Sequence, residues 1–176
     1  MARNFMCTKT DPVVETKAGK LRGFQLDGTY VFHGVKYADA KRFHQPTPVE
    51  LWEGIKNALA YGYVCPMLQQ DQPSNELMVP HRYWPLDENC QYLNIWTQHL
   101  DPNAKKPVLV WLHGGGFAAG SSIEHIAYEG ENMSKYGDVV VISLNHRLNI
   151  LGYLDLSPFG EEYKNSGNAG NADMVA

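Results

Sequence analysis

The feature that most constrains the fold of this chain is an apolar run followed at once by three glycines. Residues Val108–Leu112 are aliphatic or aromatic, and the length of the run suits a strand buried on both faces of a sheet. After His113, the residues Gly114, Gly115 and Gly116 remove every Cβ from the turn. Such a turn can adopt positive φ and bring bare backbone N–H groups up to a ligand. Open α/β sheets bind ligands at strand ends of this kind, so we expect a site here.

The surrounding pattern predicts an α/β fold with a mixed central sheet. Apolar runs at 93–96 and 138–144 are expected to form strands, and Ile123–Tyr136 is expected to form a helix with Gly137 as its C-cap. The order strand, strand, helix, strand favours parallel strands in the middle of the sheet.

The N-terminal part is predicted to be a small antiparallel meander. Strands are expected at 13–16, 20–26 and 29–35, and Asp27-Gly28 is a hairpin turn signal. Residues 38–90 contain many prolines and aromatic residues without a clear periodicity, and we interpret them as packed irregular surface.

Composition narrows the classes of function. A length of 176 residues suits one domain, and 44% hydrophobic with 19% charged residues is typical of a globular protein. The net charge is −4 and no basic run is present, which argues against nucleic acid and anionic membranes as partners. No apolar run has the length of a membrane span. The first residues lack the apolar core of a secretory signal, so we expect a cytoplasmic location, with secretion as the alternative.

Cysteine and histidine spacing gives no support for a metal site or a cofactor. The sequence has three cysteines and no C-x-x-C, and an odd count indicates free thiols first. No H-E-x-x-H is present among the seven histidines. Neither a metal nor a cofactor is therefore predicted.

Several separated motifs together resemble the type-B carboxylesterases, a family that includes cholinesterases and bacterial para-nitrobenzyl-esterase-like enzymes. The motifs, in the order and approximate spacing of that family, are ENCQYLNIW at Glu88–Trp96, HGGGF at His113–Phe117, LNHR at Leu144–Arg147 and GNAGNAD at Gly167–Asp173. VFHGVKYA and RFHQPTP resemble two further N-terminal landmarks, so the resemblance covers nearly the whole chain. It implies an α/β-hydrolase fold, with the meander beside the main sheet, and acyl transfer from a small-molecule carboxylic ester through a serine.

The resemblance implies that the backbone N–H groups of Gly115 and Gly116 belong to an oxyanion hole. Attack on an ester turns its carbonyl oxygen into an oxyanion, and fixed N–H dipoles stabilise it most in the transition state. One such donor is typically worth roughly 100- to 1000-fold in rate. The alternative is a glycine-rich turn without a catalytic use. His113 is structural in the resembling family, and the remaining histidines are expected to lie at the surface or in packing.

The catalytic serine itself is not found. No G-x-S-x-G occurs, and the nearest segment, Gly120–Glu124, fails at the last position. We therefore expect the serine, the acid and the histidine beyond Ala176, with residues 1–176 forming the N-terminal part of a single α/β-hydrolase domain truncated before the nucleophile elbow. Those residues alone are expected to be inactive and poorly soluble or partly unfolded.

The resemblance also implies three structural pairs. Arg42 should pair with Glu88 and Arg147 with Asp173, the alternative being four solvated surface charges. Cys65 and Cys90 match a disulfide of the family, while free thiols remain the other interpretation.

Two classes of function remain open at this point. The first is a carboxylic ester hydrolase, and the second is a non-catalytic, cholinesterase-like adhesion or binding domain that has lost the serine. Another α/β hydrolase, such as a lipase or thioesterase, is a weaker third. The intact glycine turn favours the enzyme, because a binding domain has no need of three consecutive glycines.

Overall fold

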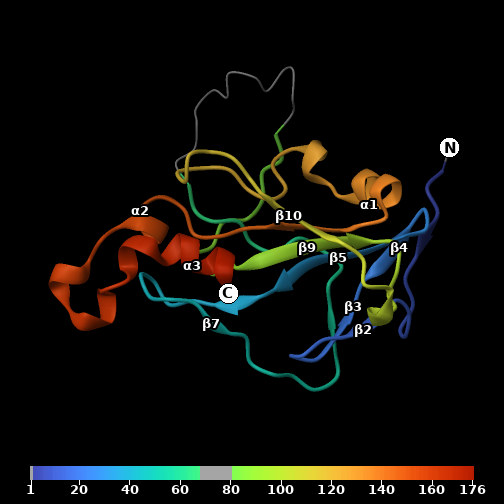
Figure 1. The fold of residues 1–176 in the computed structure, drawn as a ribbon, viewed down its shortest axis with the longest axis horizontal. Coiled ribbons are helices and arrows are strands. Elements are labelled where there is room, and N and C mark those ends of the chain that lie inside the picture. Colours follow the sequence, from blue (N-terminus) through green and yellow to red (C-terminus); the bar gives the residue numbers. More distant parts are fainter. Residues whose placement is uncertain (1, 68–80) are drawn as a thin grey trace.

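The computed structural model describes residues 2–67 and 81–176. The strands are β1 (Phe5–Met6), β2 (Val13–Glu15), β3 (Lys20–Arg22), β4 (Phe24–Leu26), β5 (Thr29–Lys36), β6 (Ala38–Asp39), β7 (Thr47–Pro48), β8 (Ile55–Asn57), β9 (Tyr92–Thr97), β10 (Val108–Leu112) and β11 (Val140–Leu144). The α-helices are α1 (Glu131–Gly137), α2 (Asn149–Tyr153) and α3 (Ala169–Val175). Turns of 3₁₀ helix lie at Pro102–Ala104, Ile126–Tyr128, Ser157–Phe159, Glu161–Tyr163 and Ser166–Asn168. The helices thus come late in the chain (Figure 1).

The main sheet has six strands in the order β1-β4-β5-β9-β11-β10. Strands β10 and β11 run parallel, and the other neighbouring pairs are antiparallel. The predicted mixed sheet is confirmed, but the expectation of parallel strands in its middle is wrong. The parallel pair lies at one edge, because β11 pairs on its other side with the antiparallel strand β9.

The N-terminal meander is divided between two sheets, because β4 and β5 belong to the main sheet while β2 and β3 do not. Strands β4 and β5 form the predicted hairpin, and Asp27 (φ 47°) and Gly28 (φ 86°) both adopt the positive φ that a tight turn of this type requires. Strand β5 then pairs with β9 and joins the two halves of the sheet. Strands β2, β3 and β8 form a separate small sheet. Of the predicted irregular segment 38–90, residues 68–80 lie outside the described part, and the remainder contains β6, β7 and β8.

Successive side chains along each strand point to opposite faces of the main sheet, and apolar side chains form a core on each face. Val31, Trp96 and Val141 pack together on one face, where α1 contacts β9 and β11. The next residue of β5, Phe32, faces the other side and packs with Leu21 of the small sheet. Figure 1 shows α1 on one side of the sheet and β2 and β3 on the other.

The helix predicted over Ile123–Tyr136 is wrong in its first half, where a 3₁₀ turn and an extended residue, Glu129, precede α1. A Cβ on Gly130 would lie 2.6 Å from Cβ of Val141, so close packing on the sheet fixes the backbone at this point. The left-handed residue after α1 is Asp138 (φ 50°) rather than the expected Gly137. None of the helices in the described residues is long and apolar enough to cross a membrane.

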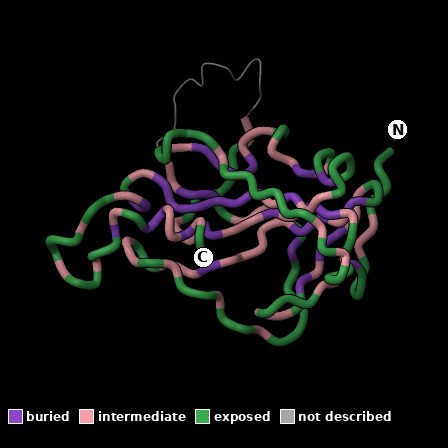
Figure 2. Tube along the Cα trace, viewed as in Figure 1, coloured by how far each residue is buried: buried purple, intermediate pink, exposed green. Residues whose placement is uncertain are grey.

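Strand β10 is exposed on both faces, which corrects the prediction of a strand buried on both. All five of its residues are exposed, from Leu109 at 36% to Val108 at 58%. The cause is its place at the edge of the described sheet, where only β11 pairs with it. Figure 2 shows the buried segments along the central strands and the exposed segments around them.

Candidate active site

The turn after β10 has a backbone that favours glycine. Gly115 has φ 123° and Gly116 has φ 60°, both in the positive-φ region that side chains rarely adopt, and Phe117 follows at φ 61°. A Cβ on Gly115 would collide with the carbonyl oxygen of Ala119. The carbonyl of Gly115 accepts from the N–H groups of Ala118 (3.1 Å) and Ala119 (3.2 Å), which closes the turn. The glycines therefore set the shape of this turn.

Gly115 and Gly116 are exposed residues. Among the residues that the structure describes, none accepts a hydrogen bond from either group. A Cβ on Gly116 would meet open space, so there is room for a ligand beside it. Two neighbouring amide groups on a fixed turn, with no internal acceptor, can bind an oxygen that carries negative charge.

A pair of stacked histidines supports the turn from behind. Nδ1–H of His113 donates to the carbonyl of Gly114 at 2.9 Å, and the His113 ring stacks on His146 with centroids 5.1 Å apart. Burial lowers the pKa of both histidines below the usual range, and the neighbouring His113 lowers that of His146 further. Both rings are therefore neutral near pH 7. These contacts indicate that His113 supports the conformation of the turn.

The far end of the turn is held by α2. The N–H of Asn149 donates to the carbonyl of Phe117 at 2.7 Å, and the Phe117 ring packs edge-on against Tyr153 at 5.3 Å. The Asn149 side chain donates in turn to the carbonyl of Pro66 at 2.8 Å. The turn is thus fixed to the chain on both sides of its glycines.

Ser122 lies in Gly120–Glu124, the segment that resembles G-x-S-x-G except at its last position, and it belongs to a buried polar network. The Asn94 amide donates to Oγ of Ser122 (3.2 Å) and of Ser143 (3.3 Å), and the N–H of Ser122 donates to Oδ1 of Asn145 (2.8 Å). Ser122 is 1% exposed. A hydroxyl enclosed in this way cannot reach a substrate, so its role is to join β9 and β11 to the loop before α1.

The structure places Arg147 and Asp173 together in the interior. Nε of Arg147 donates to Oδ2 of Asp173 at 2.8 Å and Nη2 donates to Oδ1 at 2.7 Å, with both side chains almost fully buried. The remaining guanidinium hydrogens reach the carbonyls of Lys41, His44 and Ala169. Gln91 also donates to Asp173, which explains a polar residue at this position. The pair joins α3 to the segment between β6 and β7.

Arg42 and Glu88 also meet, but at the surface. Nε of Arg42 donates to Oε2 of Glu88 at 2.7 Å, and Nη2 contacts Oε1. The side chains are 63% and 32% exposed. Solvent therefore screens this pair, in contrast to Arg147 and Asp173.

Cys65 and Cys90 are free thiols, which corrects the disulfide implied by the resemblance. Both are buried in one cluster with Leu148 and Leu151, and the Cys65 sulfur accepts from the N–H of Leu148 at 3.1 Å. A hydrogen bond with Cys65, together with burial, raises the pKa of the Cys90 thiol well above its usual range. The same hydrogen bond lowers the pKa of Cys65. Both residues pack here as small side chains among apolar neighbours. Cys7, the third cysteine, packs against the cluster of Trp96.

Sequence reasoning missed two features near the turn, although it located the turn itself. The stacking of His146 on His113 could have been suspected, because both residues belong to motifs that end neighbouring strands. The approach of His81 to Glu124 and His125 has no signal in the sequence, because the two segments are joined only by tertiary contacts.

The fold and the turn together define the class of protein. A sheet whose parallel pair ends in a fixed glycine turn is a feature of the α/β-hydrolase fold, and the described residues form part of such a fold. Comparison with solved structures agrees: an esterase from Clostridium hathewayi superposes with a TM-score of 0.94 at 65% identity, over 99% of this chain and 34% of that one. A carboxylesterase from Geobacillus stearothermophilus gives a TM-score of 0.77 at 38% identity, over 93% and 32%.

The chain belongs to the carboxylesterase family, whose model matches residues 10–176. Curated relatives include para-nitrobenzyl esterase of Bacillus subtilis, 37% identical over 95% of this chain and 33% of the relative. Phenmedipham hydrolase of Pseudarthrobacter oxydans is 41% identical over 82% of this chain and 30% of the relative. The chain spans about a third of the length of these relatives.

Proposed function

We propose that the natural-length protein containing this chain is a serine carboxylesterase, and that the N–H groups of Gly115 and Gly116 form part of its oxyanion hole. The observation that carries the proposal is the exposed glycine turn, whose two N–H groups have no acceptor among the described residues. We further propose that residues 1–176 are the N-terminal part of a single domain, and that the serine, acid and histidine lie outside them.

In the proposed reaction the serine oxygen attacks the carbonyl carbon of an ester, and its proton passes to the histidine. The carbonyl electrons move onto oxygen, where Gly115 and Gly116 would donate hydrogen bonds. When the tetrahedral intermediate collapses, the alcohol leaves with the proton and an acyl-enzyme remains. Water then repeats the sequence and releases the acid. The turn can stabilise the oxyanion only if its backbone is fixed before the reaction. The hydrogen bonds of His113 and Asn149 to the turn hold it in this way.

The substrate class that we propose is a small carboxylic ester. The relative from Clostridium hathewayi is described as hydrolysing aliphatic aromatic polyesters, and that from Bacillus subtilis is named for para-nitrobenzyl esters. Both names describe esters with an aromatic component.

We also propose a cytoplasmic location, since Cys65 and Cys90 are thiols and reducing compartments maintain thiols. Thiol labelling of freshly isolated protein tests this proposal.

The proposal is tested by assaying p-nitrophenyl acetate hydrolysis with the natural-length protein and with residues 1–176 alone. The natural-length protein should turn over, show a burst of p-nitrophenol and lose activity on labelling of its serine with a fluorophosphonate. The short polypeptide should remain at background. A natural-length protein that is folded, unlabelled and inactive would instead be an adhesion or binding domain. Turnover by residues 1–176 alone would place the nucleophile inside this chain.

A further inference from the structure

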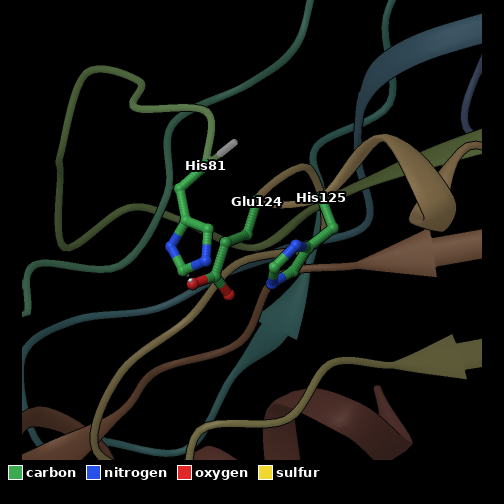
Figure 3. A group of neighbouring side chains, drawn as sticks. All are labelled: His81, Glu124 and His125. Carbon is green, nitrogen blue, oxygen red and sulfur yellow. Dashed lines mark ion pairs between the residues drawn. The ribbon is translucent and has the colours of Figure 1, made fainter. Parts of the chain in front are cut away.

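Three potential metal ligands meet outside the proposed oxyanion turn. His81, Glu124 and His125 each offer one ligand atom, and these atoms all lie within 4.8 Å of one another. Nδ1 of His81 is 3.2 Å from Oε1 of Glu124. Figure 3 shows the two imidazole rings on either side of the Glu124 carboxylate. All three residues are half-buried, so the group is shielded but reachable from solvent.

Backbone contacts hold the group together, because His81 comes from a different segment than Glu124 and His125. The N–H of Arg82 donates to the carbonyl of Glu124 at 2.8 Å, and the Arg82 guanidinium pairs with Glu129. These two contacts fix the neighbour of His81 against the loop that carries the other two residues. The approach is therefore set by the fold and does not depend on side-chain rotation alone.

The two imidazoles are also restrained relative to each other. The rings of His81 and His125 lie with centroids 4.4 Å apart at 73°, and the His125 ring packs on Tyr128 at 5.0 Å. Restrained ligands lose less conformational freedom when they bind an ion. The group is thus partly organised for binding.

The separations suit a small divalent ion. Zinc bonds of about 2.0–2.1 Å in a tetrahedral site place neighbouring ligand atoms about 3.3–3.5 Å apart. The distance of 3.2 Å from Nδ1 of His81 to Oε1 of Glu124 is close to this value, and the ligand atoms of all three residues lie within 4.8 Å of one another. Two imidazoles with one carboxylate suit zinc, whereas magnesium and calcium prefer oxygen ligands throughout.

We propose that His81, Glu124 and His125 bind one zinc ion, with solvent completing its coordination. Bound zinc would tie the segment beginning at His81 to the loop before α1. The site borders the glycine turn without belonging to it: a Cβ built on Gly120 would lie 3.3 Å from Oε2 of Glu124 and 2.8 Å from Nδ1 of His113. The site is independent of the proposed esterase activity, because it uses neither Gly115 nor Gly116.

Equilibrium dialysis of the natural-length protein tests this site. The chelator-stripped protein is dialysed against buffered Zn²⁺, and bound metal is measured by mass spectrometry. One ion per chain should bind to the wild type. Loss of a second-shell partner typically weakens metal affinity by about 10- to 100-fold, so His81→Gln and His125→Gln, which remove a ligand, should weaken it by at least that factor.

The matched control is His99→Gln, which removes a histidine that contacts Asp138 outside the group. It should leave zinc affinity unchanged. Cobalt substitution separates this site from the cysteines, since a site of imidazole and carboxylate gives weak visible bands without the charge-transfer band of a thiolate. Glu124→Gln provides a nearly isosteric third variant, and circular dichroism checks that each variant is folded.

Three results would overturn the zinc site: no binding at zinc concentrations up to that of the protein, unchanged affinity in folded His81→Gln and His125→Gln, or a thiolate band in the cobalt spectrum. Ester hydrolysis is assayed on the same preparations. An inactive protein that binds zinc would contradict only the esterase, and an active protein without zinc affinity would contradict only this site.

Discussion

The region around Arg147 and the turn after β10 differ in whether their polar groups have hydrogen-bond partners within the protein. Arg147 is 1% exposed, and its guanidinium donates to Asp173 and to three backbone carbonyls. In the turn, Gly115 and Gly116 are exposed, and no described residue accepts a hydrogen bond from their N–H groups. A buried charge must be satisfied internally because its desolvation is costly, whereas an exposed donor can be kept for a ligand. The first region therefore supports the fold, and the second offers binding groups.

This contrast is tested most strongly by Asp173→Asn in the natural-length protein. The substitution removes the counter-charge and leaves the Arg147 guanidinium buried, which should lower the free energy of unfolding by about 3–5 kcal/mol. Urea denaturation measures the loss. The matched control is Glu88→Gln, which breaks the exposed pair with Arg42 and should leave the denaturation midpoint nearly unchanged. Equal effects of the two substitutions would remove the distinction between the pairs.

His33 presents a third case, a buried polar group that lacks a full set of partners. Its Nε2 has no hydrogen-bond partner among the described residues, and its ring stacks on Tyr61 at 4.1 Å. Burial, with a contribution from Arg82, lowers the pKa of His33 to about 4. The native ring thus stays neutral while the unfolded chain takes up a proton below about pH 6.5.

The free energy of unfolding should consequently fall as the pH falls. This effect is expected to be smaller than that of Asp173→Asn. The contribution of His33 is complete above about pH 6.5 and is lost as the pH falls toward 4, which amounts to about 2 kcal/mol between pH 7 and pH 5. The lowered pKa values of His113 and His146 also make stability fall with falling pH. The contribution of His33 is therefore measured as the difference in pH dependence between the wild type and a His33 variant. Urea denaturation across this range should show a shallower pH dependence in His33→Phe. Parallel curves for the two proteins would contradict the assignment.

Local chemistry made part of this structure predictable from sequence. The hairpin at Asp27-Gly28 and the strand at Val108–Leu112 follow from residue types at adjacent positions, and the structure has both. The turn of three glycines could be located for the same reason. Its role in catalysis stays a prediction, because it depends on a nucleophile that we propose to lie outside these residues.

Tertiary packing decided the features that sequence reasoning missed. The helix expected from Ile123 begins only at Glu131, because Gly130 packs directly on the sheet. The exposure of β10 depends on which strands pair with it, and hydropathy does not report pairing. The contact of His81 with Glu124 likewise arises from two segments that no motif connects.

The central claim, that the glycine turn binds the oxyanion, is tested most directly by Gly116→Ala in the natural-length protein. A methyl group there fits in open space, so the fold should survive with the modest strain of a left-handed residue, about 1–2 kcal/mol. Gly28→Ala is the matched control, because Gly28 also has positive φ and open space but lies on the hairpin of β4 and β5.

Steady-state hydrolysis of p-nitrophenyl acetate, with thermal denaturation of the same samples, gives the answer. If the methyl group displaces the oxyanion from its donors, kcat/KM should fall by about 100-fold or more in Gly116→Ala. Gly28→Ala should keep its activity with a similar loss of thermal stability. A folded Gly116→Ala protein that keeps activity within a few-fold of wild type would contradict the assignment of this turn to the oxyanion hole.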